Sequence, residues 1–276
     1  MTGFYFALRC GTLKCPLKTK QLYRDNRLLM GTIWEVTSPR KEASRIVFAE
    51  AARIEQLLSK YIERSEGFKL NHLGKLKVSR ETFYVIKKSQ EFYRLSQGAF
   101  DITVAPLVDL WGFSNQRFQV PSNDKIHTAL GLVGSDKIIL HENDNVVEFR
   151  FPGMKIDLGA IAKGFALDCA VKKLKENNIN SCLINAGGQV YALGDKSGQN
   201  WKIAIRGAKK AEIAGVLELK DQSASTSGNY EQFFLKDGKL FGHIMDPRTG
   251  YPIETKVFSV TVVAKEGLTA DALSTA

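Results

Sequence analysis

The segment formed by residues 154–168 constrains the fold of this chain more than any other stretch. It follows an apolar run, residues 146–151, and leads through the small residues Gly159 and Gly164 into a helical pattern that we expect to begin near Lys163. Such a turn lets a ligand approach the backbone, and the N-terminus of the following helix offers unpaired N–H groups with a partial positive charge. The segment therefore predicts a strand, a turn and a helix arranged to hold phosphate.

Two charged side chains give this segment its chemistry. Lys163 adds a full positive charge near the expected phosphate site, whereas the Asp157 carboxylate suits a nucleotide hydroxyl or a base edge better than a phosphate. The spacing matches neither the Walker A loop nor the Gly-x-Gly-x-x-Gly dinucleotide fingerprint. Taken alone, the segment is as consistent with a buried turn carrying a solvent-facing lysine as with a nucleotide site.

Composition leaves the domain count open and limits the classes of partner. The chain has 276 residues, of which 44% are hydrophobic, so it can bury a large core as one domain or as two lobes. Its formal net charge of +10 suits an anionic dinucleotide, and it also suits nucleic acid. Because no helix-turn-helix, zinc-finger or RNA-binding signature accompanies the charge, nucleic acid is the weaker alternative and is not expected as a partner.

The cysteines and the N-terminus bear on metal binding and on the compartment. The four cysteines show no Cys-x-x-Cys spacing, so no structural zinc is expected, and Cys169 and Cys182 fall in segments typical of small core residues. The apolar run at residues 4–8 is too short for a secretory signal, and Arg9 before Cys10 does not fit a lipoprotein signal. We expect a cytoplasmic protein without a transmembrane segment, or a periplasmic or membrane-associated one if the N-terminus is misassigned.

The apolar periodicity predicts a mixed α+β fold. Helical spacing covers residues 44–61 and 79–96, and short strand-like runs dominate the rest of the chain. Because few helices separate the later strands, we expect mainly antiparallel sheets with flanking helices. The expected strands are residues 33–37, 137–140, 146–151, 181–184, 201–205, 216–219, 230–235 and 257–264, with hairpin-turn sequences at 141–145, 194–198 and 236–238.

The C-terminal residues suggest a metal site. Asp271 and Thr275 lie four positions apart, so a helix places both side chains on one face, where two oxygen donors suit Mg²⁺ or another hard cation. The same spacing is common on solvent-exposed helices, and on spacing alone that reading is favoured.

Among the histidines, His243 is the candidate for chemistry. It precedes a turn sequence at residues 246–250 and is a candidate base for an incoming hydroxyl. The alternative is a structural histidine bonded to Asp246. The remaining histidines lie in polar or turn-like stretches and are expected at the surface: His72, His127 and His141.

Several motifs, in their order along the chain, together resemble one known family. They are Met30-Gly31-Thr32, residues 61–71, 98–104 and 110–113, Asn185-Ala186-Gly187-Gly188, Ser225-Thr226-Ser227-Gly228, and residues 242–250 and 270–275. Over residues 29–276 the chain resembles the ApbE-type flavin transferases, the FAD:protein FMN transferase family. Residues 1–28 have no counterpart there, Gln189 stands where an aspartate is common, and we expect a domain truncated at its C-terminus relative to the family.

The resemblance implies a two-lobed α+β architecture and an activity. The implied enzyme is a metal-dependent transferase that passes FMN from FAD to a threonine hydroxyl of a protein acceptor and releases AMP. Implied acceptors are flavoproteins such as subunits of membrane redox complexes. Two alternatives stay open: an FAD pyrophosphatase that gives FMN and AMP, and an FAD-binding protein without turnover.

The resemblance also implies the residues of the site. It implies Mg²⁺ held by the Ala160 carbonyl, Asp271 and Thr275, with Lys163 stabilising developing charge and His243 handling the hydroxyl proton. The implied FAD contacts are Met30, Tyr61, Ala99, Phe100, Asp101, Asp157, Lys163 and Met245.

Overall fold

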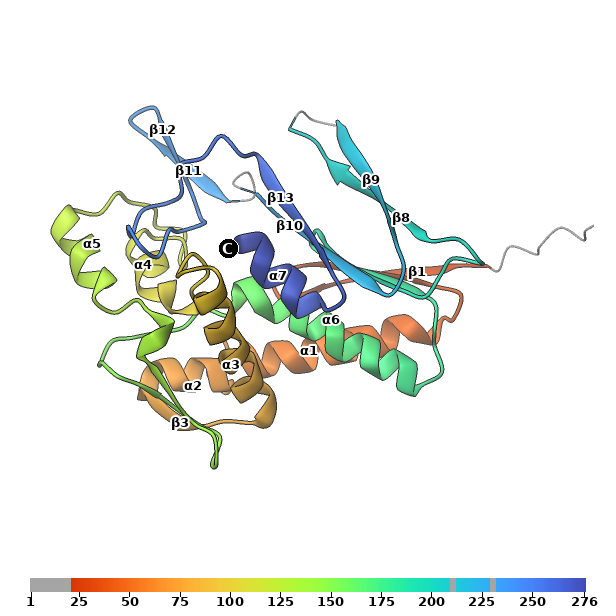
Figure 1. Ribbon diagram of the computed structural model, residues 1–276, viewed down its shortest axis with the longest axis horizontal. Helices are drawn as coiled ribbons and strands as arrows, with labels where there is room; N and C mark the ends of the chain where they lie inside the picture. Colours follow the sequence, from red (N-terminus) through yellow and green to blue (C-terminus); the bar gives the residue numbers. More distant parts are fainter. Residues whose placement is uncertain (1–20, 209–211, 229–231) are drawn as a thin grey trace, which may run out of the picture.

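A six-stranded antiparallel sheet organises the fold (Figure 1). The computed structural model describes residues 21–208, 212–228 and 232–276. In the order in which they pair, the strands are β1 (Tyr23–Leu29), β2 (Thr32–Ser38), β6 (Cys182–Ala186), β7 (Gln189–Leu193), β10 (Gln222–Gly228) and β13 (Ser259–Ala264). The first strand draws most of its residues from the flank, residues 1–28, that the sequence motifs do not cover.

Three helices pack against this sheet and against one another: α1 (Glu42–Leu58), α6 (Gly159–Glu176) and α7 (Gly267–Thr275). In α1 the buried side chains recur at helical spacing, for example Val47, Ala51, Ile54 and Leu58, and Trp34 of β2 lies in the same core. Figure 1 shows α1 and α6 running side by side beneath the sheet. The main apolar core therefore lies between the sheet and these helices.

Most of the remaining elements form the second part of the molecule, but the hairpin that contains Trp201 and Leu219 packs against Ala192 and Ala224 of the main sheet. A three-stranded sheet pairs in the order β3 (Lys75–Lys77), β5 (Val146–Phe149) and β4 (Ile138–His141), and two hairpins form from β8 (Trp201–Arg206) with β9 (Ile213–Leu219) and from β11 (Phe233–Lys236) with β12 (Lys239–Gly242). The other helices are α2 (Glu66–Leu73), α3 (Arg80–Leu95), α4 (Ala105–Leu110) and α5 (Asn123–Leu130), with short 3-10 turns at Ile102–Val104 and Ser135–Lys137. This arrangement confirms the predicted α+β class with mainly antiparallel sheets.

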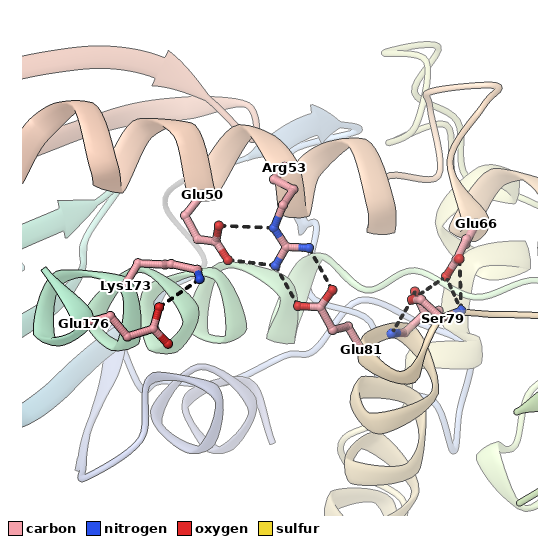
Figure 2. A network of polar contacts seen from close by, with 8 residues as sticks. Glu50, Arg53, Glu66, Ser79, Glu81, Lys173 and Glu176 are labelled. Carbon is pink, nitrogen blue, oxygen red and sulfur yellow. Dashed lines mark hydrogen bonds and ion pairs between the residues drawn. The ribbon is translucent and has the colours of Figure 1, made fainter.

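Ion pairs join the helices of the two parts (Figure 2). The Arg53 guanidinium of α1 donates to Glu50, at 2.7 and 3.1 Å, and to Glu81 of α3, at 2.6 and 2.7 Å. These bonds raise the pKa of Arg53 and lower that of Glu81. Glu50 and Glu81 also approach Cys169, but because Arg53 already occupies both carboxylates, we interpret this cluster as a structural clamp between α1 and α3.

The start of α6 differs from the sequence prediction. The helix begins at Gly159 rather than near Lys163, which places Lys163 in its second turn. Residues 154–158 form no regular element and pair with no strand among the described residues. The run Gly159 to Ala162 begins with glycine and is rich in small residues, so it resembled a turn, whereas Ile161 and Ala162 are buried in the core as part of the helix.

The other expected elements agree with the structure to within a few residues where the structure describes them, but several elements were missed. The helices predicted at 44–61 and 79–96 are α1 and α3, and the turn at 236–238 closes the β11–β12 hairpin with positive φ at Asp237 and Gly238. Part of the strand predicted at 230–235 lies outside the described residues. Strands β1, β3, β7, β10 and β12 and helices α2, α4 and α5 were not predicted.

The described cysteines and histidines lie where the sequence indicated. Cys182 is buried and Cys169 is partly buried against the core, and burial raises the pKa of each thiol to about 12. Cys10 and Cys15 lie outside the described residues. His72, His127 and His141 are exposed. None of the helices in the described ranges is both long enough and apolar enough to cross a bilayer.

Candidate active site

A cavity of about 420 Å³ lies where the main sheet, helices α6 and α7, and the region around α4 meet. Its size falls in the range of roughly 300–1,000 Å³ that is typical of small-molecule sites. The structure brings together every residue that the sequence analysis assigned to a site, since the cavity is lined by Met30, Tyr61, Ala99, Phe100, Asp101, Asp157, Ala160, Lys163, His243, Met245, Asp271 and Thr275.

Two tight hairpin turns form one wall of the cavity. Met30-Gly31 joins β1 to β2 and Gly187-Gly188 joins β6 to β7, and φ is positive at both residues of each turn. This backbone pattern is that of a type I′ turn, which suits the twist of a hairpin. A Cβ on Gly187 would lie 2.2 Å from the Thr32 hydroxyl oxygen, so glycine is required for the two turns to pack together.

The N-terminus of α6 forms a second wall. Gly159 and Ala160 line the cavity, and the N-cap residue Leu158 provides no side-chain cap. The Gly159 N–H donates to Asp157 Oδ1 at 2.8 Å. A helix N-terminus that opens into a cavity attracts anions through its N–H groups and its dipole.

Lys163 and Asp271 meet inside the cavity. Lys163 Nζ lies 3.6 Å from Asp271 Oδ1 and donates to the Gly159 carbonyl at 3.0 Å. Asp271 Oδ2 accepts a hydrogen bond from the Gly164 N–H at 2.9 Å. Asp271 is only 3% exposed, and burial raises its pKa against the opposing effects of Lys163 and the Gly164 N–H. A carboxylate buried to this degree requires nearby positive charge to remain ionised.

The oxygen atoms around Asp271 suit a hard cation. Ala160 and Thr275 line the same cavity, and Gly164, which donates to Asp271, is the residue whose N–H in a regular α-helix bonds the Ala160 carbonyl. Gln189 also lines the cavity; its Nε2 donates to the Gly267 carbonyl at 2.8 Å, while its buried Oε1 has no partner among the described residues. Carboxylate, carbonyl and hydroxyl oxygens are the ligands that Mg²⁺ prefers.

One largely buried lysine, Lys60, was not predicted from the sequence and contacts Asp157 of the cavity lining. Lys60 Nζ lies 2.8 Å from Asp157 Oδ2 and donates to Ser114 Oγ at 3.0 Å, and Ser114 in turn donates to Asp109. Burial lowers the pKa of Lys60, but the ion pair with Asp157 outweighs this effect and the net pKa is raised. Lys60 therefore holds Asp157 in place. Its position beside Tyr61 was the only signal in the sequence.

The Asp101 carboxylate is hydrogen-bonded to other residues of the protein. Its Oδ1 accepts hydrogen bonds from the Thr103 N–H, the Thr103 hydroxyl and the Ser135 hydroxyl, at 2.8, 2.7 and 2.6 Å. Its Oδ2 accepts from the Ser135 N–H at 3.1 Å. Burial raises the pKa of Asp101 while these bonds lower it. These bonds favour a role for Asp101 in fixing the cavity wall over the implied direct contact with FAD.

His243 and Asp246 are engaged with different partners. His243 Nδ1 lies 3.2 Å from the Gln232 carbonyl oxygen. Asp246 instead accepts two hydrogen bonds from the Arg248 side chain, at 2.8 and 3.0 Å, and these lower its pKa. The Arg248 side chain therefore occupies the Asp246 carboxylate, and His243 remains the candidate base on the cavity wall.

Further polar residues line the cavity without an assigned role. Three belong to β10, which the sequence analysis quoted as a motif without predicting a strand: Ser225, Thr226 and Ser227. Ser227 Oγ lies within 2.9 Å of Ser274 Oγ and 3.2 Å of Thr275 Oγ1, so β10 positions the end of α7.

The chain is similar in sequence to known proteins. A model described as the ApbE family matches residues 30–276. The FAD:protein FMN transferase of Klebsiella pneumoniae is 33% identical over 266 residues, which cover 94% of this chain and 83% of that protein. The FAD:protein FMN transferase of Treponema pallidum is 32% identical over 301 residues, which cover 99% of this chain and 83% of that protein.

Solved structures match to a similar extent. The ApbE protein of Thermotoga maritima superimposes with a TM-score of 0.86 at 34% identity, over 92% of this chain and 85% of that chain. The flavin transferase ApbE of Vibrio cholerae superimposes with a TM-score of 0.82 at 28% identity, over 92% of this chain and 85% of that chain.

Proposed function

The chain belongs to the ApbE family and is a transferase enzyme, and we propose that it transfers FMN from FAD to a threonine hydroxyl of a protein acceptor, with release of AMP. The observation that carries the proposal is the convergence of the α6 N-terminus, Lys163 and the buried Asp271 on one cavity. Chemistry at a pyrophosphate requires positive charge around the phosphate oxygens. Here Lys163 and a cation held by Asp271 would supply that charge.

Different parts of the cavity would bind the pyrophosphate and the ring systems of FAD. The N-terminus of α6 and Lys163 offer N–H groups and positive charge to the pyrophosphate. Met30, Tyr61, Phe100 and Met245 offer apolar and aromatic surface to the ring systems. Asp157, held by Lys60 and by the Gly159 N–H, offers remaining acceptor capacity to a donor group of the nucleotide.

The donor set fits a divalent cation, which we propose to be Mg²⁺. The Asp271 carboxylate, the Thr275 hydroxyl and the Ala160 carbonyl would hold it, and the unpartnered Gln189 Oε1 adds acceptor capacity nearby. When bound, the cation would supply positive charge that neutralises the pyrophosphate and the departing phosphate.

In the proposed transfer, the threonine oxygen forms a bond to the phosphorus of the FMN half of FAD. The bond between that phosphorus and the bridging oxygen breaks, and AMP leaves with the bridging oxygen. His243 takes the threonine proton. Because a carbonyl only accepts hydrogen bonds, the contact with Gln232 places a hydrogen on Nδ1 of His243. Lys163 stabilises the charge that develops on the phosphoryl oxygens.

Incubation with FAD, Mg²⁺ and a threonine-bearing acceptor tests the proposal, with mass measurement of the acceptor and of the free nucleotides. We expect FMN on the acceptor and AMP in solution, in equal amounts. Free FMN together with AMP would indicate an FAD pyrophosphatase, and intact bound FAD would indicate a carrier without turnover. The proposed acceptors are flavoproteins such as subunits of membrane redox complexes.

A further inference from the structure

The β11–β12 hairpin stands directly at the cavity. Gln232, which precedes β11, and His243, which follows β12, both line the cavity, so the two feet of the hairpin belong to its wall. In Figure 1 the hairpin extends outward from this point, apart from the main sheet. Within the described ranges it pairs with no third strand. Both of its edges therefore offer backbone N–H and C=O groups.

The inner face of the hairpin is fixed by aromatic packing. Phe234 and Phe241 stack with their ring centroids 5.2 Å apart. Phe234 also contacts Phe113 and Phe118, at 5.7 and 5.2 Å, and Phe241 contacts Trp111 at 5.4 Å. Since side chains alternate along a strand, this packing turns the neighbouring residues toward solvent.

The outer face carries a continuous apolar strip. Phe233, Leu235 and Leu240 are 45%, 68% and 49% exposed. Leu235 pairs with Leu240 across the hairpin, and Phe233 pairs with Gly242, the residue before His243. The strip thus leads from the two leucines to Phe233 and on to the cavity, over roughly 10 Å at the usual rise of a strand.

We propose that this strip, defined as Phe233, Leu235 and Leu240, docks the threonine-bearing segment of the acceptor protein in an extended conformation. The proposal rests on the proposed function, because FMN transfer to a protein requires a polypeptide to reach the cavity. An extended segment can pair with a free hairpin edge, and its apolar side chains can cover the strip. Exposed apolar surface that continues into a site is typical of a binding surface, and the rigid inner face keeps the strip aligned with the cavity.

The variant Leu235→Ser combined with Leu240→Ser tests the proposal. The probe is an acceptor protein selected because the Klebsiella pneumoniae relative attaches FMN to it. Both side chains are exposed, so the fold is retained, and we expect kcat/KM for the acceptor to fall by about tenfold or more, mainly through KM. FAD affinity should not change, because the strip lies outside the cavity lining. The amides of residues 233–242 should gain protection from hydrogen exchange when the acceptor is added to the wild type.

The matched control is Leu95→Ser at the end of α3, where the leucine is 69% exposed and does not line the cavity. It should transfer FMN at the wild-type rate. Wild-type kcat/KM in the double variant would overturn the docking proposal, as would an equal loss in the control. A wild-type dimer that the leucine substitutions dissociate would assign the strip to a second copy and also overturn it. If the wild type labels no acceptor at all, the proposed function itself fails, an outcome that the variants do not mimic.

Discussion

The Lys163 ammonium lies 3.6 Å from the Asp271 carboxylate, and this contact joins the second turn of α6 to α7 inside the cavity. The Gly164 N–H donates to the same carboxylate. A positive group proposed for phosphate and a negative group proposed for a cation are therefore already paired in the protein. Each of the two limits the cost of burying the other.

Replacing Lys163 by alanine should weaken FAD binding by about tenfold at low ionic strength and by less at high ionic strength. The lost interaction is mainly Coulombic, and salt screens it. Lys163→Arg should restore binding only in part, because a planar guanidinium replaces a compact ammonium. FAD fluorescence titration at two salt concentrations measures the effect. Lys75→Ala, on an exposed ion pair with Glu148, is the control, and equal affinities for wild type and Lys163→Ala would remove Lys163 from the site.

Replacing Asp271 by alanine should abolish metal-dependent turnover while FAD still binds. The residues proposed to contact the flavin and the adenine lie on other elements, and Lys163 would continue to offset the phosphate charge. The measurement is turnover with Mg²⁺ as the only added metal, together with FAD titration. Asp124→Ala, at an exposed position on α5, is the control. Wild-type turnover by Asp271→Ala would contradict the proposed cation site.

Replacing Gly164 by alanine should reduce the free energy of unfolding by about 1–3 kcal/mol, despite the better helix propensity of alanine. A Cβ at this position would lie 2.2 Å from the Gly267 carbonyl oxygen, so α7 must shift. Gly215→Ala is the matched control, because its Cβ would meet nothing within 4 Å. Urea denaturation compares the two. Equal stability of both variants would show that α6 and α7 do not require this close contact.

The stability of the protein should fall as the pH rises from about 4 to 7, in part because of Asp168. Its carboxylate accepts the Gly267 and Leu268 N–H groups at the start of α7, yet burial raises its pKa from 3.8 to about 6. Between these values the folded state keeps a proton that the unfolded state has released, so raising the pH favours unfolding. The full effect is at most about 3 kcal/mol.

Urea denaturation across this pH range, for wild type and Asp168→Asn, isolates that contribution. The other buried carboxyl groups with raised pKa values, Asp101 and Asp271, are present in both proteins. We expect a flatter pH profile for Asp168→Asn. Parallel profiles would show that Asp168 ionises at the same pH in the folded and unfolded states.

Periodicity predicted those parts of the fold in which apolar side chains alone determine the structure. Helices α1 and α3 follow their apolar spacing, and Ser79 caps α3 by accepting the Thr82 N–H at 3.2 Å. Strand β10 could not be predicted in this way, because it is rich in serine and threonine. Its hydroxyls are satisfied by partners distant in sequence, such as the Val190 carbonyl bonded to Ser223.

The sequence predicted residues that gather at the candidate site, but it did not predict the ion pairs between them. Motif resemblance named residues that the cavity brings together, yet nothing in the sequence paired Lys163 with Asp271 or Lys60 with Asp157. Such pairs depend on how α7 and the segment after α1 pack against α6. The same holds for Gln189, whose Nε2 donates to the Gly267 carbonyl and whose Oε1 has no partner in the described part of the chain.

The most direct test of the account is tandem mass spectrometry of an acceptor protein after incubation with FAD, Mg²⁺ and either the wild-type enzyme or Asp271→Ala. We expect the wild type to add the mass of FMN less water to one threonine, an acceptor with valine at that position to stay unmodified, and Asp271→Ala to add nothing. FMN attached to another residue type, or equal labelling by Asp271→Ala, would contradict the proposed transfer in this cavity.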